Sequence, residues 1–190
     1  TWMDVCVNGI LPTPRHGKPV EINAYWYNAL RILEELGTKL GKDVAHYAAL
    51  AEKVKISFNE KFPIPEKGWL RDVISGTKAD EQLRCNQIWA VSMPFTMLDP
   101  EQERSVLATV GRHLYTPCGL RTLSPEDPEF KPHYGGAQKA RDLAYHQGTV
   151  WPFPLGAYYL AYLKVHGNTP EAAAYVRKQR QPVEAMMRQG

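Results

Sequence analysis

The feature that most constrains the fold is a hydrophobic period of three to four residues, the period of an α-helix, which recurs along most of the chain. An early stripe of this kind precedes Gly37, which stands where its helix should end. The next stripe covers about five turns, and the two helices should form a hairpin. Strand-like alternation is almost absent, which favours an all-α fold. The two stripes consist of Val20, Ala24, Tyr27, Leu30 and Leu33, and of Val44, Tyr47, Ala51, Val54, Phe58 and Phe62.

Four further helices are predicted, and they pair with one another as two more hairpins. Pro94 should bend the first of the four or delay its start. Asp99, Pro100 and Gln102 form a strong start signal for the second, because an acidic N-cap, a proline at the first helical position and an amide at the third are favoured there. The four helices are expected at residues 88–98, 100–114 and 155–166 and from residue 170 onward.

The connections between these helices alternate in length. Short turns join the members of each hairpin, whereas connections of about 20 and 30 residues follow the second and fourth helices. Long loops in a compact domain are usually functional, and every second connection in a stack of hairpins lies at the same end. Trp69, Arg71 and Asp72 in one long connection should therefore share a face with residues 116–147 in the other and with residues 2–18.

Composition excludes several classes of protein. The 190 residues suit one ordinary domain, with 44% hydrophobic and 23% charged residues. The net charge of +3 comes from scattered basic residues, so a nucleic-acid partner is not expected. Cys6, Cys85 and Cys118 lack metal-ligand spacing and fit free thiols in a reducing compartment, so we expect no metal site and a cytoplasmic location. No apolar run approaches the roughly 20 residues that span a membrane.

Five tryptophans and a set of hydrogen-bonding side chains suit a carbohydrate ligand, since a pyranose ring has apolar faces surrounded by hydroxyl groups. Trp26 and Trp89 lie within predicted helices and are interpreted as core residues. Trp2, Trp69 and Trp151 lie beside loops and are better candidates for sugar platforms. The hydrogen-bonding candidates are Asp4, Arg15, Glu21, Asp72, Asn86, Gln87, Arg121, Asp142, His146 and Gln147.

Five segments of the sequence resemble signature stretches of bacterial and archaeal glycogen-debranching enzymes, in the same order: TWMD, TPRHGKPVEINAYWYNAL, RCNQIWAVSMPF, GLRTLSPEDPEF and YHQGTVWPFPLGAYYLAYLKVHG. The resemblance implies an (α/α)6 toroid of six helical hairpins, of which the three predicted here are about half. Residues 1–190, which start without an initiator Met, are therefore expected to be a fragment of a single glucosidase domain. Cys85, Cys118 and Phe153-Pro154 depart from the pattern, which bears on substrate preference more than on the family.

The resemblance also implies roles for individual residues. Asp4, the last residue of TWMD, would be the general acid, and Trp2 could raise its pKa by excluding water. His146 and Gln147 would present an imidazole and an amide to sugar hydroxyls. The substrate-binding residues expected are Trp2, Arg15, Lys18, Glu21, Trp69, Asp72, Asn86, Gln87, His146, Gln147 and Trp151.

Structural roles remain open for three of the carboxylates. Glu21 begins a predicted helix, where the helix dipole favours a negative charge whether or not it binds glucose. Asp72 beside Arg71, and Asp142 beside Arg141, fit salt-bridged loop anchors. Glycosidic hydrolysis needs a second catalytic carboxylate, and the resembling enzymes place this Glu beyond the last of the five segments. We therefore expect the catalytic base to lie outside the chain.

Two classes of function follow. The first is part of a hydrolase that releases α-1,6-linked glucose at branch points of glycogen or another branched α-glucan, with inversion and without a cofactor, in which case the isolated chain would be inactive. The alternative is a non-catalytic carbohydrate-binding module. A third hypothesis is another (α/α)6 glycosidase, such as a relative of glucoamylase or trehalase. Half a toroid leaves apolar helical faces uncovered, so self-association is also expected.

Overall fold

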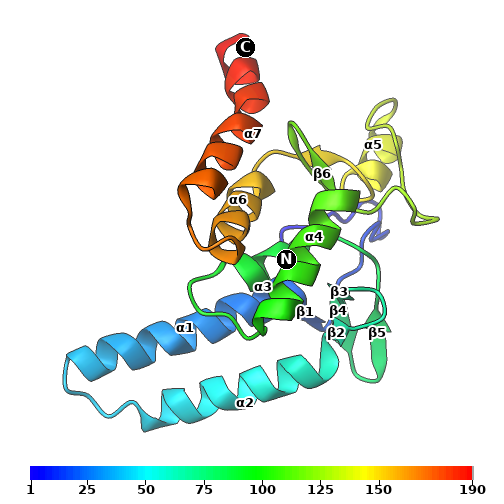
Figure 1. Cartoon of the computed structure of the whole chain (residues 1–190). Helices are drawn as coiled ribbons and strands as arrows, with labels where there is room; N and C mark the ends of the chain where they lie inside the picture. Colours follow the sequence, from blue (N-terminus) through cyan, green and yellow to red (C-terminus); the bar gives the residue numbers. More distant parts are fainter. Residues whose placement is uncertain (190) are drawn as a thin grey trace.

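The computed structural model describes residues 1–189, and its first unit is a long helical hairpin (Figure 1). Helices α1 (Val20–Lys39) and α2 (Ala45–Lys61) form it, as predicted. The expectation that Gly37 ends the first helix is wrong, because α1 continues for two more residues. Gly37 serves close packing instead, since a Cβ there would collide with Cγ1 of Val44 at the start of the returning chain.

The second hairpin consists of α3 (Ile88–Ser92), preceded by a 3-10 turn, and α4 (Pro100–His113). The predicted helix over residues 88–98 is too long, because the backbone becomes extended at Met93, ahead of Pro94. The predicted start of α4 is confirmed. Oδ1 of Asp99 accepts hydrogen bonds from the amides of Glu101 and Gln102, at 2.9 and 2.8 Å, and Oε1 of Gln102 accepts one from the amide of Asp99 at 2.9 Å.

The third hairpin consists of α6 (Pro154–Val165) and α7 (Pro170–Gln189), which match the predicted positions. A further short helix, α5 (Gln138–Ala144), interrupts the long connection after α4 and was not predicted. The core lies where α3 packs against α1, α4 and α6. Its largest fully buried aliphatic side chains include Leu30, Ile88 and Leu114. The fold is all-α, as predicted.

Three small antiparallel sheets join the long connections to one another, although the sequence shows almost no alternation of apolar and polar residues that would predict strands. Each strand has only two or three residues, which is too short for alternation to be visible. The sheets are β1-β4-β5, β2-β3 and β6-β7-β8. Their strands are β1 (Lys18–Pro19), β2 (Pro63–Ile64), β3 (Trp69–Leu70), β4 (Val73–Ser75), β5 (Lys78–Asp80), β6 (Tyr115–Thr116), β7 (Gly119–Arg121) and β8 (Val150–Trp151).

The long connections share one side of the molecule, as the alternation of loop lengths predicts. Figure 1 shows the strands β2 to β5, the segment around α5 and the N-terminal segment on the right of the view, whereas the α1–α2 and α6–α7 turns lie on the left. Among the helices of residues 1–189, none combines the length and apolar character that crossing a membrane requires.

Candidate functional site

A buried ionic network lies where the N-terminal segment meets the start of α1 and the strand β4. Arg15 donates to both carboxylate oxygens of Glu21, at 2.5 and 2.6 Å, and its Nε donates to Oδ2 of Asp72 at 2.5 Å. All three side chains are almost completely buried. Burial opposes the charged form of Arg15, but the hydrogen bonds to Glu21 and the charge of Asp72 outweigh it and raise the pKa of Arg15. One guanidinium therefore satisfies two carboxylates.

Two more predicted residues extend this network toward the N-terminus. Nδ2 of Asn86 donates to Oδ1 of Asp72 at 2.9 Å, and the indole Nε1 of Trp2 donates to Oδ1 of Asn86 at 2.8 Å. The amide of Val20, the first residue of α1, donates to the backbone oxygen of Asp72 at 2.9 Å. This chain of bonds fixes Trp2 to the rigid start of α1. Asp72 is a salt-bridged anchor, as interpreted, but its partner is Arg15 and not its neighbour Arg71, which pairs with Glu81.

Arg84 links the network to the segment that carries His146 and Gln147. Its Nη1 donates to the backbone oxygen of His146 at 2.7 Å, and its Nη2 donates to Oε1 of Gln147 at 2.6 Å. Nε2 of Gln147 donates to Glu129 at 3.2 Å, so both ends of this amide already bind protein groups. Gln87 is likewise occupied, since it accepts from the amide of Leu70 and donates to the backbone oxygen of Arg84. These amides position the loops.

Aromatic rings cover the network on the side of Trp2. The Trp2 ring meets the ring of Phe153 at 4.8 Å and that of Trp151 at 6.2 Å, both nearly edge to face. Trp89 lies against Phe153 at 5.8 Å, and Tyr145 meets Trp151 at 5.0 Å. Trp2, Trp89 and Trp151 are partly exposed and Phe153 is about half exposed, so part of the apolar surface of the cluster faces solvent. Flat partly exposed rings of this kind suit the apolar faces of a sugar.

His146 sits beneath this aromatic cluster and is 2% exposed. Its ring lies 5.0 Å from that of Trp2 and 4.6 Å from that of Tyr145. Neither ring nitrogen has a hydrogen-bond partner within residues 1–189. Burial and then the charge of Arg84 lower the pKa of His146 to about 4, so the imidazole is neutral near pH 7. A neutral imidazole can both donate and accept one hydrogen bond.

Asp4 lies two residues after Trp2, and its side chain is 68% exposed. Hydrogen bonds from the amino group and the hydroxyl of Thr1 lower the pKa of Asp4. Burial acts in the opposite direction and raises the pKa of Asp4, so the expectation that Trp2 raises it by excluding water stays a prediction.

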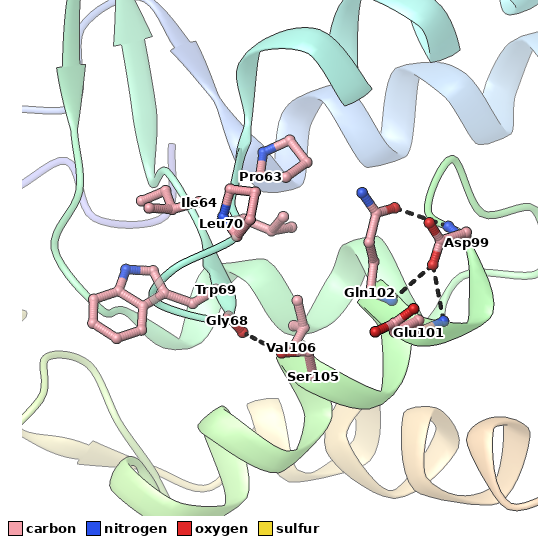
Figure 2. Close-up of a pocket in the computed structure, with 11 residues that line it drawn as sticks. Pro63, Ile64, Gly68, Trp69, Leu70, Asp99, Glu101, Gln102, Ser105 and Val106 are labelled. Carbon is pink, nitrogen blue, oxygen red and sulfur yellow. Dashed lines mark hydrogen bonds between the residues drawn. The ribbon is translucent and has the colours of Figure 1, made fainter.

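Two predicted platform and binding residues lie apart from the cluster. Trp69 lines a separate cavity of about 220 Å³ between the β2–β3 turn and the first turns of α4, which Figure 2 shows. Its Nε1 donates to the backbone oxygen of Glu81 at 2.9 Å. Lys18 lines a third cavity, beside Trp26. Trp26 is 48% exposed, so its interpretation as a core residue is wrong, whereas Trp89 packs partly against the core as predicted.

Three residues of this region were not singled out from the sequence. Arg84 lies in the segment RCNQIW, but nothing in the surrounding sequence distinguishes a buried arginine from an exposed one at this position. Tyr145 precedes His146 and shares its aromatic surroundings. Phe153 was noted only as a departure from the expected pattern. Of the other candidates, Asp142 has a covered Oδ2 without a partner in the described part of the chain, and Arg121 donates to the backbone oxygen of Tyr115 at 3.4 Å.

Comparison with protein families identifies one family that covers almost the whole chain. A family model described as amylo-alpha-1,6-glucosidase matches residues 1–189. The glycogen debranching enzyme of Saccharomyces cerevisiae is 28% identical over 212 residues, a match that covers 89% of this chain and 14% of that protein. The chain therefore spans about one seventh of the length of this curated relative.

Solved structures of low sequence identity show the same fold. One is a GH63 mannosylglycerate hydrolase from Thermus thermophilus in complex with Tris, with a TM-score of 0.61 and 17% identity, covering 85% of this chain and 36% of that one. Another is described as a sialidase, with a TM-score of 0.64 and 20% identity, covering 84% of this chain and 14% of that one. Both are much longer chains that contain a comparable helical unit.

Proposed function

Because the chain belongs to the amylo-alpha-1,6-glucosidase family, as the match over residues 1–189 shows, we propose that it forms part of an inverting glycoside hydrolase of a longer protein. Its substrate would be α-1,6-linked glucose at the branch points of glycogen or another branched α-glucan. The observation that carries the proposal is that an exposed carboxyl group, Asp4, lies two residues after Trp2, whose ring belongs to an aromatic cluster and is fixed by a buried ionic network. This combination provides a proton-donating group next to a sugar platform.

Asp4 is the proposed general acid, which protonates the oxygen of the leaving sugar. In the chain as it stands, Asp4 is exposed and its pKa is lowered by Thr1. A bound oligosaccharide that covers Asp4 would displace water from the carboxyl group, and desolvation favours the neutral, proton-donating form. A neighbouring part of the longer protein would have the same effect. We therefore propose that Asp4 acts as the acid only when an oligosaccharide or a neighbouring part of the longer protein covers it.

Trp2, Trp151 and Phe153 are the proposed sugar platform. Their rings form the partly exposed surface of the cluster, and each good ring contact contributes about 1 kcal/mol. His146 lies edge to face against Trp2, and neither of its ring nitrogens has a partner among residues 1–189. We propose that it binds a sugar hydroxyl when the rings separate around the ligand. The network side chains would act as positioning residues rather than as direct ligands: Arg15, Glu21, Asp72, Asn86, Gln87 and Gln147.

The water-activating base is proposed to come from outside this chain. Glu21 and Asp72 are the carboxylates of the network, and Arg15 holds both of them. A carboxylate that is hydrogen-bonded to a guanidinium and hidden from solvent is a poor base for an incoming water molecule. Inverting chemistry also requires a gap of about 6.5–9.5 Å between acid and base, which leaves room for that water.

A non-catalytic carbohydrate-binding module is the second candidate, and one observation favours it. Both network carboxylates are paired with Arg15, so the network offers a sugar platform among residues 1–189 but no free carboxylate to act as a base. Binding of a branched α-glucan without cleavage would follow from this arrangement.

Glucose release from a panose-type oligosaccharide tests the proposal. The longer protein should release glucose from the α-1,6 linkage and act poorly on trehalose and maltose, whereas the 190-residue chain should bind the oligosaccharide without cleaving it. Binding without cleavage by the longer protein would establish the second candidate. Preferred cleavage of trehalose or maltose would instead point to another hydrolase of this fold.

A further inference from the structure

A basic cavity shares no lining residue with the aromatic cluster, and the proposed hydrolase does not use it. Its volume is about 260 Å³, and it lies between α1, α2 and β1. Three lysines from different parts of the chain line it: Lys18 from β1, and Lys53 and Lys61 from α2. The other lining residues are Asn23, Trp26, Leu50, Val54, Ser57, Phe58, Phe62 and Ile74. No carboxylate is among them.

The three ammonium groups are available for a ligand. Within residues 1–189, no carboxylate lies at ion-pair distance from Lys18, Lys53 or Lys61. Nζ of Lys61 donates to the hydroxyl of Ser57, also on the cavity wall, at 3.2 Å. The acidic residues of α2 nearest to them, Glu52 and Glu60, line a neighbouring hollow that Lys53 and Ser57 also line. Neither carboxylate is at ion-pair distance from Lys53, and positive charges around a concave surface focus their potential and attract an anion.

Trp26 gives the cavity a second recognition element. Its side chain is 48% exposed on α1, although a tryptophan on a helix of this length is usually turned toward the core. Asn23, one turn earlier, donates to the backbone oxygen of Pro19 at 2.8 Å and so lies fixed beside the ring. An exposed indole with amide and hydroxyl neighbours suits the apolar face and the hydroxyls of a sugar ring.

From these observations we infer that the cavity binds a phosphate monoester carried on a hexose. The phosphate, with a charge of about −1.5 to −2, would lie among the lysines, and the hexose ring would lie against Trp26. The cavity is slightly smaller than the range of about 300–1,000 Å³ typical of drug-sized ligands, which suits a single sugar phosphate. The phosphorylated hexose could be free or part of a glucan chain, since both present the same chemistry. The inference is independent of the proposed hydrolase, because it uses neither Asp4 nor the aromatic cluster.

Calorimetric titration of the 190-residue chain with glucose 6-phosphate at low ionic strength tests the inference. The Lys53→Gln/Lys61→Gln variant should bind about tenfold more weakly or worse, since hydrogen bonds to charged groups are the strong ones. Lys55→Gln removes a charge from the same helix outside the cavity and should change the affinity by about twofold or less. Equal affinities of the double variant and of Lys55→Gln would overturn the inference.

The two parts of the ligand are tested separately. Trp26→Ala should weaken binding of glucose 6-phosphate but not of inorganic phosphate, and the indole N–H resonance of Trp26 in the unaltered chain should shift with glucose 6-phosphate. Equal affinity for both probes, together with an unshifted resonance, would overturn the assignment of a hexose. A maltodextrin phosphorylated at C6 identifies the source: tighter binding than glucose 6-phosphate indicates a phosphorylated glucan, and weaker binding a free sugar phosphate.

Discussion

Arg15 holds both carboxylate oxygens of Glu21, at 2.5 and 2.6 Å, across the point where the N-terminal segment meets the first turn of α1. The same guanidinium bonds Asp72 from the long connection after α2. One buried side chain therefore joins three segments of the chain that carry predicted site residues. The geometry of the whole candidate site depends on it.

Replacement of Arg15 by Met should destabilise the fold strongly. Two buried carboxylates would lose their common partner, and breaking a buried ion pair by removing one member costs about 3 to 5 kcal/mol. Urea unfolding measures the change in the free energy of unfolding. Arg180→Met is the matched control, because Arg180 pairs with Glu184 on the exposed surface of α7 and its loss should cost about 1 kcal/mol or less. Equal losses in the two variants would contradict the importance of the network.

His146 should make stability fall as the pH drops below about 6.5. Its pKa is lowered to about 4 in the folded protein, whereas an unfolded histidine titrates near 6.5. The unfolded state therefore binds the proton more tightly between these values, and folding stability is lost as the pH falls from about 6.5 to about 4. The full effect would be on the order of 3 kcal/mol.

The His146→Gln variant isolates this contribution from that of the carboxylates. The difference in unfolding free energy between the unaltered chain and the variant should change with pH in the window from about 6.5 to about 4 and should be flat above it. NMR titration of the imidazole gives the pKa directly. A pKa of His146 near its ordinary value would show that the ring is hydrated, and the unpaired nitrogens would then need no ligand.

Trp151→Ala should weaken binding of a neutral branched oligosaccharide by roughly fivefold or more, because loss of a stacked ring costs on the order of 1 kcal/mol. Calorimetry on the unphosphorylated ligand measures this. Trp69→Ala provides the control, since Trp69 lines a different cavity. Equal weakening in both variants would show that Trp151 contributes to general stability rather than to a sugar platform.

The periodic elements of the fold were predictable, and the irregular ones were not. The stripes of α1 and α2 and the capping residues of α4 are local signals, and the structure confirms them. The two-residue strands and α5 were missed because they are too short to show a period. Met93 and Pro94 ended α3 earlier than its apolar spacing indicated, because the residue before a proline avoids helical backbone.

The site was predictable in its membership but less so in its arrangement. Trp2, Asn86 and Asp72 come together although 84 residues separate the first two. The sequence indicated these residues as site candidates but did not show which contacts they make. The pairing of Asp72 with Arg15 instead of its neighbour Arg71 depends on tertiary contacts across the long connection. Adjacent charges in a sequence often point in opposite directions, so adjacency is a weak guide to ion pairs.

Self-association of the isolated chain should follow from the outer face of α1. Apolar side chains there are exposed at helical spacing, and an extended apolar patch favours association. Sedimentation should show a larger species that Leu33→Glu/Leu36→Glu converts to a monomer, whereas Lys42→Glu on the neighbouring turn should not. A monomer at all concentrations would contradict the prediction. The exposed residues of this face outside the basic cavity are Ile22, Tyr25, Ile32, Leu33, Leu36 and Leu40.

The role of Asp4 as general acid is tested most directly by the Asp4→Asn variant of the longer enzyme that we propose contains this chain, assayed on two substrates. An α-1,6-linked glucose needs a proton on its leaving oxygen, whereas α-glucosyl fluoride releases a leaving group that needs little protonation. The variant should lose a factor of about 100 or more on the branched oligosaccharide and far less on the fluoride. Near-normal release of α-1,6-linked glucose, or equal losses on both substrates, would contradict the account.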